Sequence, residues 1–246
     1  MVNTSPAGIL APFHTIVTRA NEVAKHFGRR AALHEIQHRI VNRLVPFQVL
    51  KGMTATADGI DQTLLDAGDL RTRFATRDEL LAAAAVPELA EEMSVDFIEQ
   101  ALARGDECYG IFEGPQLVSL GWYSNQPTQL SDNLTLRFDR SWMYMYKGYT
   151  LRSHRGKRLH GIGMSKALHA YTQRGSRGLI SYVKSTNFQS LRSTGRMGYR
   201  IFGEIYIAEA IGRPLIYATP GCAAYDFRVE SRGGRGRAKG DQNSDS

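Results

Sequence analysis

The sequence between residues 152 and 160 reads RSHRGKRLH. It follows an aromatic-rich segment typical of a strand, Trp142–Leu151, and leads into a segment with helical periodicity, Leu159–Tyr171. A glycine-containing loop at the start of a helix leaves backbone N–H groups without partners at the positive end of the helix dipole. Such an end binds phosphate, and the basic side chains of the loop add positive charge: Arg152, Arg155, Lys157 and Arg158. The stretch therefore predicts an anion site where a strand passes into a helix.

A second patterned block begins one predicted strand later. The strand is Leu179–Val183, and Asn187 then precedes a short predicted helix, Phe188–Met197. A glycine and a tyrosine open the next predicted strand, Tyr199–Ile207. The order strand, helix, strand, helix, strand is typical of a mixed α/β layout with helices packed on a sheet.

The sequence upstream of the loop predicts helices first and strands later. Residues 15–45 have apolar side chains at spacings of three and four and are predicted to be helical up to Pro46. Helices and loops are expected over most of Ala57–Ala103, with Ser94 capping one helix, and a loop is expected over Ser124–Asn133. Further strands are predicted at Phe47–Thr56, Cys108–Phe112, Leu117–Tyr123, Leu134–Phe138 and Leu215–Thr219.

These patterns divide the chain into three parts. Residues 1–46 are an N-terminal helical extension, residues 47–229 are the α/β domain, and residues 230–246 lack large apolar side chains and are predicted to be a disordered basic and polar tail. For the extension we leave three roles open: a cap over an acceptor site, a homodimer contact, or a binding surface for a lipid-like acyl donor.

Composition excludes several classes of protein. The chain has 246 residues, of which 42% are hydrophobic, so it can bury a core and is not disordered throughout. Two cysteines, Cys108 and Cys222, cannot form a disulfide framework or a cysteine-rich zinc module. We find no membrane-spanning segment and no secretory signal, and therefore expect a cytoplasmic protein.

Charge is distributed unevenly. Residues 146–200 contain 12 basic and no acidic side chains, whereas residues 52–115 contain 14 acidic and 4 basic ones. A long cationic segment without counter-charge indicates an anionic ligand at part of it. We interpret the acidic segment as a solvated surface, with attraction of a cationic amine acceptor as the alternative.

Both patterned blocks resemble the GNAT superfamily of acyl-CoA-dependent N-acyltransferases. The family's pyrophosphate loop has the pattern Arg/Gln-x-x-Gly-x-Gly/Ala, which aligns with Arg155-Gly156-Lys157-Arg158-Leu159-His160. The downstream family pattern, Asn-x-x-Ala-x-x-Leu-Tyr-x-x-x-Gly-Phe, aligns with Asn187 through Tyr199. The resemblance covers roughly residues 105–210 and includes the spacing between the two blocks.

The resemblance implies a fold and a reaction. The fold would be a mixed, mostly antiparallel central sheet flanked by helices, with a splayed strand pair, Trp142–Leu151 and Leu179–Val183, that forms the acyl-CoA cleft. The reaction would be direct attack of a small-molecule or peptide amine on acetyl-CoA or another acyl-CoA, which serves as co-substrate, with no metal. The implied donor-binding residues are Tyr149, Thr150, Leu151, Arg155, Gly156, Lys157, Arg158, Leu159, His160, Asn187 and Ser190, and the implied catalytic positions are Asn187 and Thr194.

Three residues depart from the family pattern. Arg158 stands where glycine is usual and His160 where glycine or alanine is usual, and we expect both side chains to point outward, with Arg158 reaching a phosphate. Thr194 stands where many members have a tyrosine that protonates the leaving thiolate. A threonine hydroxyl is a far weaker acid than a phenol.

Two other functions compete with acyl transfer. The sequence His34-Glu35-Ile-Gln-His38 matches the H-E-x-x-H zinc-peptidase signature, in which the two histidines would bind zinc and Glu35 would activate water. The charged Arg39 and the lack of an evident third ligand argue against this reading.

Nucleic-acid binding is the second alternative. It would use the cationic segment, the Arg-Gly-rich tail and four tyrosines as stacking platforms: Tyr144, Tyr146, Tyr149 and Tyr182. We favour the interpretation that these tyrosines pack in or around the core, so nucleic acid is not an expected partner.

Overall fold

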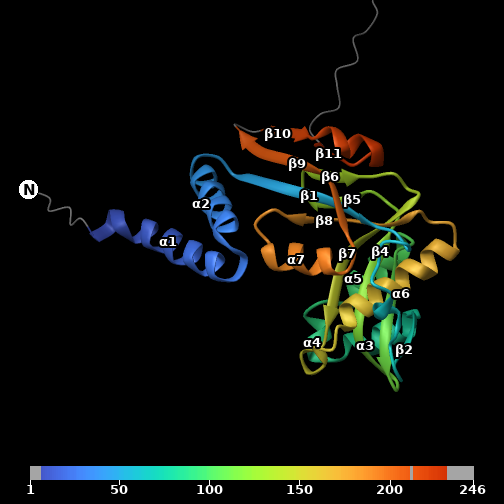
Figure 1. Ribbon diagram of the computed structural model, residues 1–246. Coiled ribbons are helices and arrows are strands. Elements are labelled where there is room, and N and C mark those ends of the chain that lie inside the picture. Colours follow the sequence, from blue (N-terminus) through green and yellow to red (C-terminus); the bar gives the residue numbers. More distant parts are fainter. Residues whose placement is uncertain (1–6, 211–212, 232–246) are drawn as a thin grey trace, which may run out of the picture.

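The computed structural model describes residues 7–210 and 213–231 and centres on one large sheet (Figure 1). The sheet has eight strands in the order β10-β9-β1-β8-β7-β4-β3-β2. Their bounds are β1 Phe47–Ala55, β2 Arg71–Phe74, β3 Glu107–Glu113, β4 Gln116–Ser124, β7 Trp142–Thr150, β8 Gly178–Lys184, β9 Arg200–Ala210 and β10 Arg213–Ala218. A three-stranded sheet in the order β11-β6-β5 consists of β5 Thr128–Ser131, β6 Leu134–Arg137 and β11 Arg228–Ser231.

Helices follow the predicted order along the chain. Two N-terminal helices precede the sheet, three short helices lie between β2 and β3, and one helix each follows β7 and β8. They are α1 Ala7–Phe27, α2 Arg29–Leu44, α3 Arg77–Ala84, α4 Pro87–Ala90, α5 Val95–Ala103, α6 Leu159–Gln173 and α7 Phe188–Arg196, with the 3-10 turns η1 Gln62–Leu65, η2 Arg152–His154 and η3 Pro220–Tyr225. No described helix combines the length and the apolar character that crossing a bilayer requires.

One strand pair of the large sheet is parallel. All its other neighbours are antiparallel, but β7 and β8 run in the same direction, and α6 provides the crossover that a parallel pair needs. Their pairing covers only Trp142–Tyr144 against Gly178–Ile180. Beyond it, β7 continues to Thr150 and β8 to Lys184 without pairing with each other, so the two strands diverge.

Helices cover both faces of the sheet at β4. The ring of Trp122 lies 5.3 Å from that of Phe97 on α5, and the ring of Tyr123 lies 5.3 Å from that of Tyr171 on α6. Successive side chains of a strand point to opposite faces. Helices α5 and α6 therefore lie on opposite sides of the sheet, and the main buried core extends over both.

The small sheet closes a second core. Leu134, Leu136 and Val229 of this sheet are buried in a cluster that also contains Tyr144 of β7 and Ile205 of β9. The expectation that the tyrosines of the cationic segment pack in or around the core is confirmed, because Tyr144 is buried and stacks at 6.3 Å on each of its two tyrosine neighbours, Tyr146 and Tyr182.

The N-terminal part forms two helices where a single helical segment was predicted. The chain reverses at Gly28, whose φ of 89° is accessible to glycine at little cost, and α1 and α2 form a hairpin. The hairpin contacts the domain near α7, where the rings of Phe27 and Phe188 lie 5.6 Å apart. Periodicity alone did not reveal the break, because apolar spacing continues on both sides of it.

Three strand predictions need correction. The polar segment Ser124–Asn133 contains β5, and the segment predicted as helices and loops contains β2; both are short strands at a sheet edge, where polar and charged residues are common. Glu230 and Ser231, assigned by prediction to the disordered tail, pair with β6 in β11. The rest of that tail, residues 232–246, lies outside the described residues.

Candidate active site

The loop between β7 and α6 has the backbone of a helix entrance. The chain leaves β7 at Thr150, makes the turn η2 and enters α6 at Leu159. Gly156 has φ 83° and Arg158 has φ 59°, both in the left-handed region that favours glycine. Arg158 is the N-cap of α6 and holds no side-chain cap bond. Arg158 thus adopts a backbone conformation that favours glycine, which is the usual residue at its position in the family pattern.

The loop presents a row of backbone donors. In the described part of the chain, the amides of residues 156–161 donate to no protein acceptor, whereas the next amide, Ile162 N, donates to Arg158 O at 3.1 Å. Unpartnered amides in the first turn of a 15-residue helix carry partial positive charge. This confirms the part of the sequence prediction that concerns backbone N–H groups at the mouth of α6.

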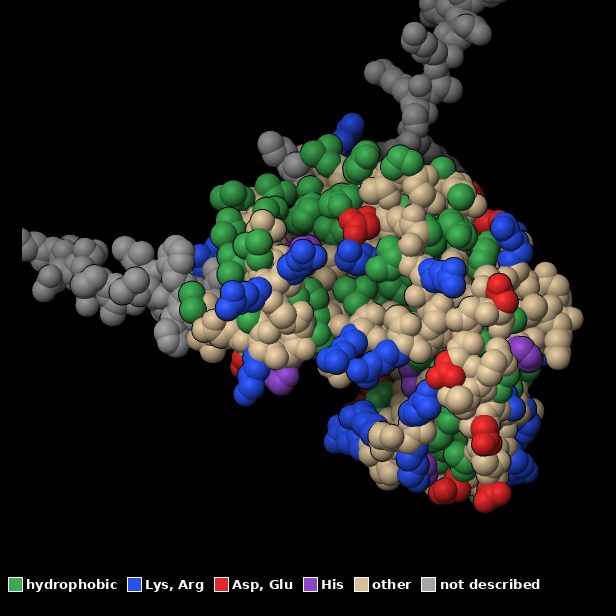
Figure 2. Space-filling model, in the orientation of Figure 1, with side chains coloured by type: hydrophobic (Ala, Val, Ile, Leu, Met, Phe, Trp, Pro, Cys, Tyr) green, Lys and Arg blue, Asp and Glu red, His purple; other side chains and the backbone are tan. Residues whose placement is uncertain are grey.

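A cleft of about 750 Å³ opens beside this row. Figure 2 shows the molecule hollowed between α7 and the loop before α6, with Lys and Arg side chains gathered on both sides. The walls come from η1, the end of β7, the loop, α6 and α7, and their residues are Asp61, Leu64, Thr150, His154, Arg155, Gly156, Arg158, Leu159, His160, Gly161, Ser193, Arg196 and Met197.

The cations of the loop differ in their partners. The Arg155 Nε donates to the carbonyl of Thr150 at 3.3 Å, and its guanidinium lies 5.5 Å from the ring centre of Tyr149. Arg158 points outward as expected, but it meets Asp61, with Nη2 3.0 Å from Oδ2. Lys157 forms no ion pair within the described residues. Arg155 and Lys157 are therefore the loop cations whose charge is available to an anion.

His160 points inward, and the expectation that it points outward is wrong. The ring lies against β7 at Gly148, where a β-carbon would be 2.5 Å from His160 Cε1. The first turn of α6 packs on β7, so its second residue faces the strand. Burial lowers the pKa of His160, which keeps the imidazole neutral at pH 7.

The divergence of β7 and β8 begins beside a bulge. On β7, Lys147 pairs with Trp122 and Met145 with Tyr123, which leaves Tyr146 as the additional residue. A bulge bends its strand and increases its twist. Ser181 Oγ donates to Met145 O at 2.9 Å at the point where backbone pairing has ended.

Backbone groups at the end of β7 are partly engaged by β4. The amide of Leu151, expected to hold the pantetheine arm, donates to Val118 O at 3.0 Å. The carbonyl of Tyr149 accepts from Ser119 Oγ at 3.2 Å, and Thr150 lines the cleft. Leu151 N is therefore unavailable to a ligand.

Helix α7 reaches the cleft with different residues from those expected. Asn187 Oδ1 caps the helix by accepting from Ser190 N at 3.1 Å, and Thr194 Oγ1 donates to Ser190 O at 2.9 Å. None of the three lines the cleft; Ser193 and Arg196 do. Their spacing of three places them on one helix face, and this periodicity is the signal that the alignment overlooked.

Glu88 fixes the start of the loop and was not found from the sequence. Its Oε1 accepts from Arg152 N at 2.7 Å and from Tyr149 Oη at 2.8 Å. The hydrogen bond from the Arg152 amide, followed by that from Tyr149, lowers the pKa of Glu88. The carboxylate is thus ionised at neutral pH and holds the end of β7 to α4.

The geometry on both sides of the cleft now identifies the architecture. A mostly antiparallel sheet contains one diverging parallel pair, and the helix between its strands begins with unpartnered amides, as the resemblance implies. The observed architecture agrees with the fold that the resemblance to the GNAT superfamily implies. No family model matches the sequence, and no curated protein matches it.

Solved structures resemble this fold at low identity. A GCN5-related N-acetyltransferase-like protein from Streptococcus suis aligns with 15% identity and a TM-score of 0.45, over 79% of this chain and 67% of that one. A GNAT-family acetyltransferase from Colwellia psychrerythraea aligns with 15% identity and a TM-score of 0.45, over 67% and 57%. A GNAT-family structure from Novosphingobium aromaticivorans aligns with 14% identity and a TM-score of 0.43, over 66% of this chain and 63% of that one, so the chain spans less than two thirds of its length.

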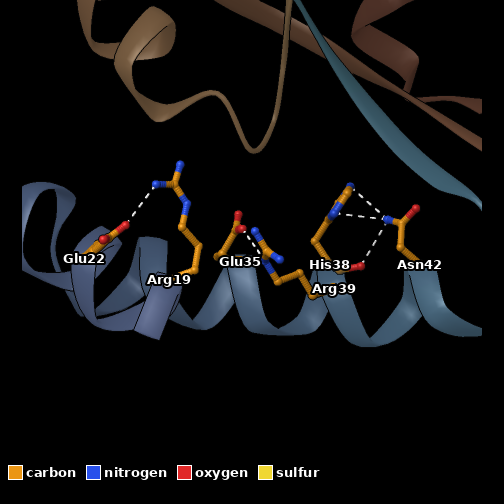
Figure 3. A network of polar contacts seen from close by, with 6 residues as sticks. All are labelled: Arg19, Glu22, Glu35, His38, Arg39 and Asn42. Carbon is orange, nitrogen blue, oxygen red and sulfur yellow. Dashed lines mark hydrogen bonds and ion pairs between the residues drawn. The ribbon is translucent and has the colours of Figure 1, made fainter. Parts of the chain in front are cut away.

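The side chains of the zinc-peptidase signature make other contacts in this structure. His34 Nε2 lies 3.0 Å from Ser185 Oγ. Glu35 binds Arg39 at 2.6 Å and His38 contacts Asn42, as Figure 3 shows. Burial, followed by the charge of His34, lowers the pKa of His38. No group of three His, Cys, Asp or Glu side chains within the described ranges is arranged to hold a metal. Nothing therefore supports the zinc reading.

Proposed function

We propose that the protein transfers an acyl group, acetyl in the first instance, from acyl-CoA to an amine acceptor. The observation that carries the proposal is the row of unpartnered amides at residues 156–161, which lines a basic cleft beside the diverging strands. Amides at a helix N-terminus bind diphosphate oxygens, and the family to which the motifs are similar uses them in this way.

The residues around the cleft fit a diphosphate. Arg155 and Lys157 stand on the loop, and Arg196 stands across from them on α7. Guanidinium groups bind phosphate oxygens through paired hydrogen bonds, and an ammonium adds a compact positive charge. Three cations from two elements would hold the two phosphates against the row of amides.

The diverging strands fit an extended arm. Beyond Tyr144 and Ile180, the facing edges of β7 and β8 make no ladder hydrogen bonds with each other. Backbone groups on these edges would bind the amides of a pantetheine arm, as strands bind an added strand.

Catalysis would depend mainly on positioning. The amine nitrogen forms a bond to the thioester carbonyl carbon, the carbon–sulfur bond breaks, the sulfur leaves as thiolate and the nitrogen loses one proton. Holding both reactants in line removes much of the entropic barrier. Thr194 supplies no acid here, because its hydroxyl donates to the carbonyl of Ser190 within α7.

Calorimetry with acetyl-CoA tests the proposal directly. We expect saturable binding at one site per chain and weaker binding of pantetheine, which lacks the diphosphate. With an amine that the protein accepts, acetyl-CoA should release free thiol. Absence of acetyl-CoA binding at millimolar concentration would overturn the proposal. Binding of a generic polynucleotide in competition with acetyl-CoA would favour the nucleic-acid alternative.

A further inference from the structure

A second cavity lies beside β7, at the bulge where the strands begin to diverge. It has a volume of about 400 Å³, within the range of pockets for small molecules. Its walls come from the end of α5, the end of β4, the small sheet and β7, and its residues are Arg104, Asp106, Ser124, Pro127, Thr128, Gln129, Thr135 and Tyr146.

The cavity contains a buried carboxylate with an unused oxygen. The side chain of Asp106 is 1% exposed. Its Oδ2 accepts from Tyr146 Oη at 3.0 Å and from Arg104 Nη2 at 2.8 Å. Its Oδ1 is buried and has no hydrogen-bond partner among the residues that the structure describes. Because a buried polar group without a partner is costly, a native protein retains one where a ligand or water completes it.

The local sequence fixes the position of this carboxylate. Helix α5 ends with Gly105 at φ 82°, where Gly105 N donates to Leu102 O at 2.9 Å and Asp106 N donates to Ala101 O at 3.0 Å. This pair of bonds is a Schellman motif, which sets the direction of the chain after the helix. Asp106 is thereby held rigidly between α5 and β3.

A partly exposed cation, Arg104, stands beside the carboxylate. Arg104 donates through Nε and Nη2 to the same Asp106 oxygen, and its guanidinium also interacts with the hydroxyl of Tyr146. The side chain of Arg104 is 49% exposed. The cavity thus offers an acceptor for an ammonium and, next to it, a guanidinium donor for a carboxylate.

The cavity and the donor cleft use opposite faces of β7. A β-carbon on Gly148 would meet both His160 of α6 and Met145, so Gly148 faces α6. The ring of Tyr146, in contrast, lies 6.4 Å from that of Phe97 on α5. Helices α5 and α6 cover opposite faces of the sheet. An amine in the cavity would therefore approach the divergence from the side opposite the basic cleft.

We infer that this cavity is the acceptor site and that it takes a free α-amino acid, with the ammonium on Asp106 Oδ1 and the carboxylate on Arg104. The inference rests on the proposed acyl transfer. It also selects one side chain, Asp106, from the acidic segment that the sequence offers as an attraction for amines. Free amino acids fit better than the N-terminus of a peptide, because a peptide lacks the carboxylate next to the amine.

The test compares two variants with a matched control. Asp106→Asn keeps the shape and an acceptor for Tyr146 but removes the charge. Gln129→Trp places a large side chain in the cavity from an exposed position on its wall. Asp132→Asn removes an exposed carboxylate of the neighbouring turn and is the control. The probes are the free L-amino acids, each paired with its carboxamide, at fixed acetyl-CoA, with thiol release and amine binding by calorimetry as readouts.

We expect the wild type to bind and acetylate at least one amino acid with a KM about tenfold lower than for its carboxamide. Asp106→Asn should raise that KM at least about tenfold through loss of a charge-assisted contact, and Gln129→Trp should raise it as much by filling the cavity. Neither variant should change the Kd of acetyl-CoA, and Asp132→Asn should keep the wild-type KM. If acetyl-CoA binds but no amino acid is bound or acetylated, or if both variants retain the wild-type KM, the inference is overturned and the donor site stands. If acetyl-CoA itself does not bind, it is the proposed function that fails.

Discussion

The imidazole of His160 on α6 occupies the space that a side chain on Gly148 of β7 would need. A β-carbon at residue 148 would lie 2.5 Å from His160 Cε1 and 3.0 Å from Nδ1. The family pattern places a small residue where His160 stands, so in this chain the glycine on the strand compensates for the larger residue on the helix. The contact connects the mouth of the basic cleft to the strand that would hold the donor.

Gly148→Ala should therefore destabilise the protein and disturb the cleft. The histidine ring must leave its position, and an overpacked contact costs about 1–3 kcal/mol. Urea unfolding measures the loss. The double variant Gly148→Ala/His160→Ala is the control, because it removes the obstructing ring. Gly148→Ala should cost less free energy of unfolding in the His160→Ala background than in the wild type. An additive double variant would contradict the direct contact.

Backbone strain at Arg158 should be measurable separately from its ion pair. Arg158→Ala and Arg158→Gly both remove the contact with Asp61, but only glycine relieves the left-handed φ of 59°. A left-handed conformation costs a residue with a β-carbon about 1–2 kcal/mol, and the greater freedom of glycine in the unfolded chain offsets part of the gain. We expect the glycine variant to be more stable than the alanine variant by about 1 kcal/mol in urea unfolding. Equal stabilities would show that the loop relaxes without strain.

The loop could be predicted from the sequence because its signal is local. A glycine, three flanking cations and the first apolar residue of a helix stand within six positions, and the helix begins at Leu159 as predicted. The capping role of Asn187 and the hydrogen bond of Thr194 within α7 were missed for the opposite reason. Both side chains bond to the backbone of the helix they belong to, and alignment with a family pattern carries no information about that choice.

Contacts between residues that are distant along the chain could not be predicted from the sequence. Glu88 accepts a hydrogen bond from Arg152, 64 residues further along the chain, and Asp106 accepts one from Tyr146, 40 residues further along. Each depends on how α4 or α5 packs against β7, and no periodicity encodes that packing. The bulge at Tyr146 is likewise a property of strand pairing, and it decides where β7 turns away from β8.

Glu79 should make the protein more stable as pH rises through the acidic range. A hydrogen bond from Arg73, at 2.6 Å, and one from the backbone of Thr76 lower the pKa of Glu79 to about 2, below its ordinary value near 4.5. The unfolded chain therefore binds more protons than the folded one between these values. The stabilisation is complete above pH 4.5 and is lost as pH falls towards 2. Unfolding of the wild type at pH 5, 4 and 3 measures it.

Glu79→Gln isolates this effect. Glutamine preserves the capping box at the start of α3, in which Thr76 and residue 79 exchange hydrogen bonds, but it does not titrate. The variant should be less stable than wild type at pH 6, and the difference should shrink at pH 3. A constant difference across the range would mean that the charge on Glu79 contributes nothing.

The charge of Lys157 should determine donor affinity if the loop binds a diphosphate. Lys157→Glu reverses the charge of an exposed side chain that has no ion pair in the described part of the chain, so the fold should be retained. Loss of one charge-assisted contact and addition of a repulsive one should raise the Kd of acetyl-CoA about 10–100-fold. Lys166→Glu makes the same change two turns further along α6, away from the first turn, and serves as the control.

The Kd of acetyl-CoA should rise with salt in the wild type and depend less on salt in Lys157→Glu, because screening weakens attraction between exposed charges. Equal affinities of Lys157→Glu and Lys166→Glu would place the diphosphate elsewhere than at the mouth of α6.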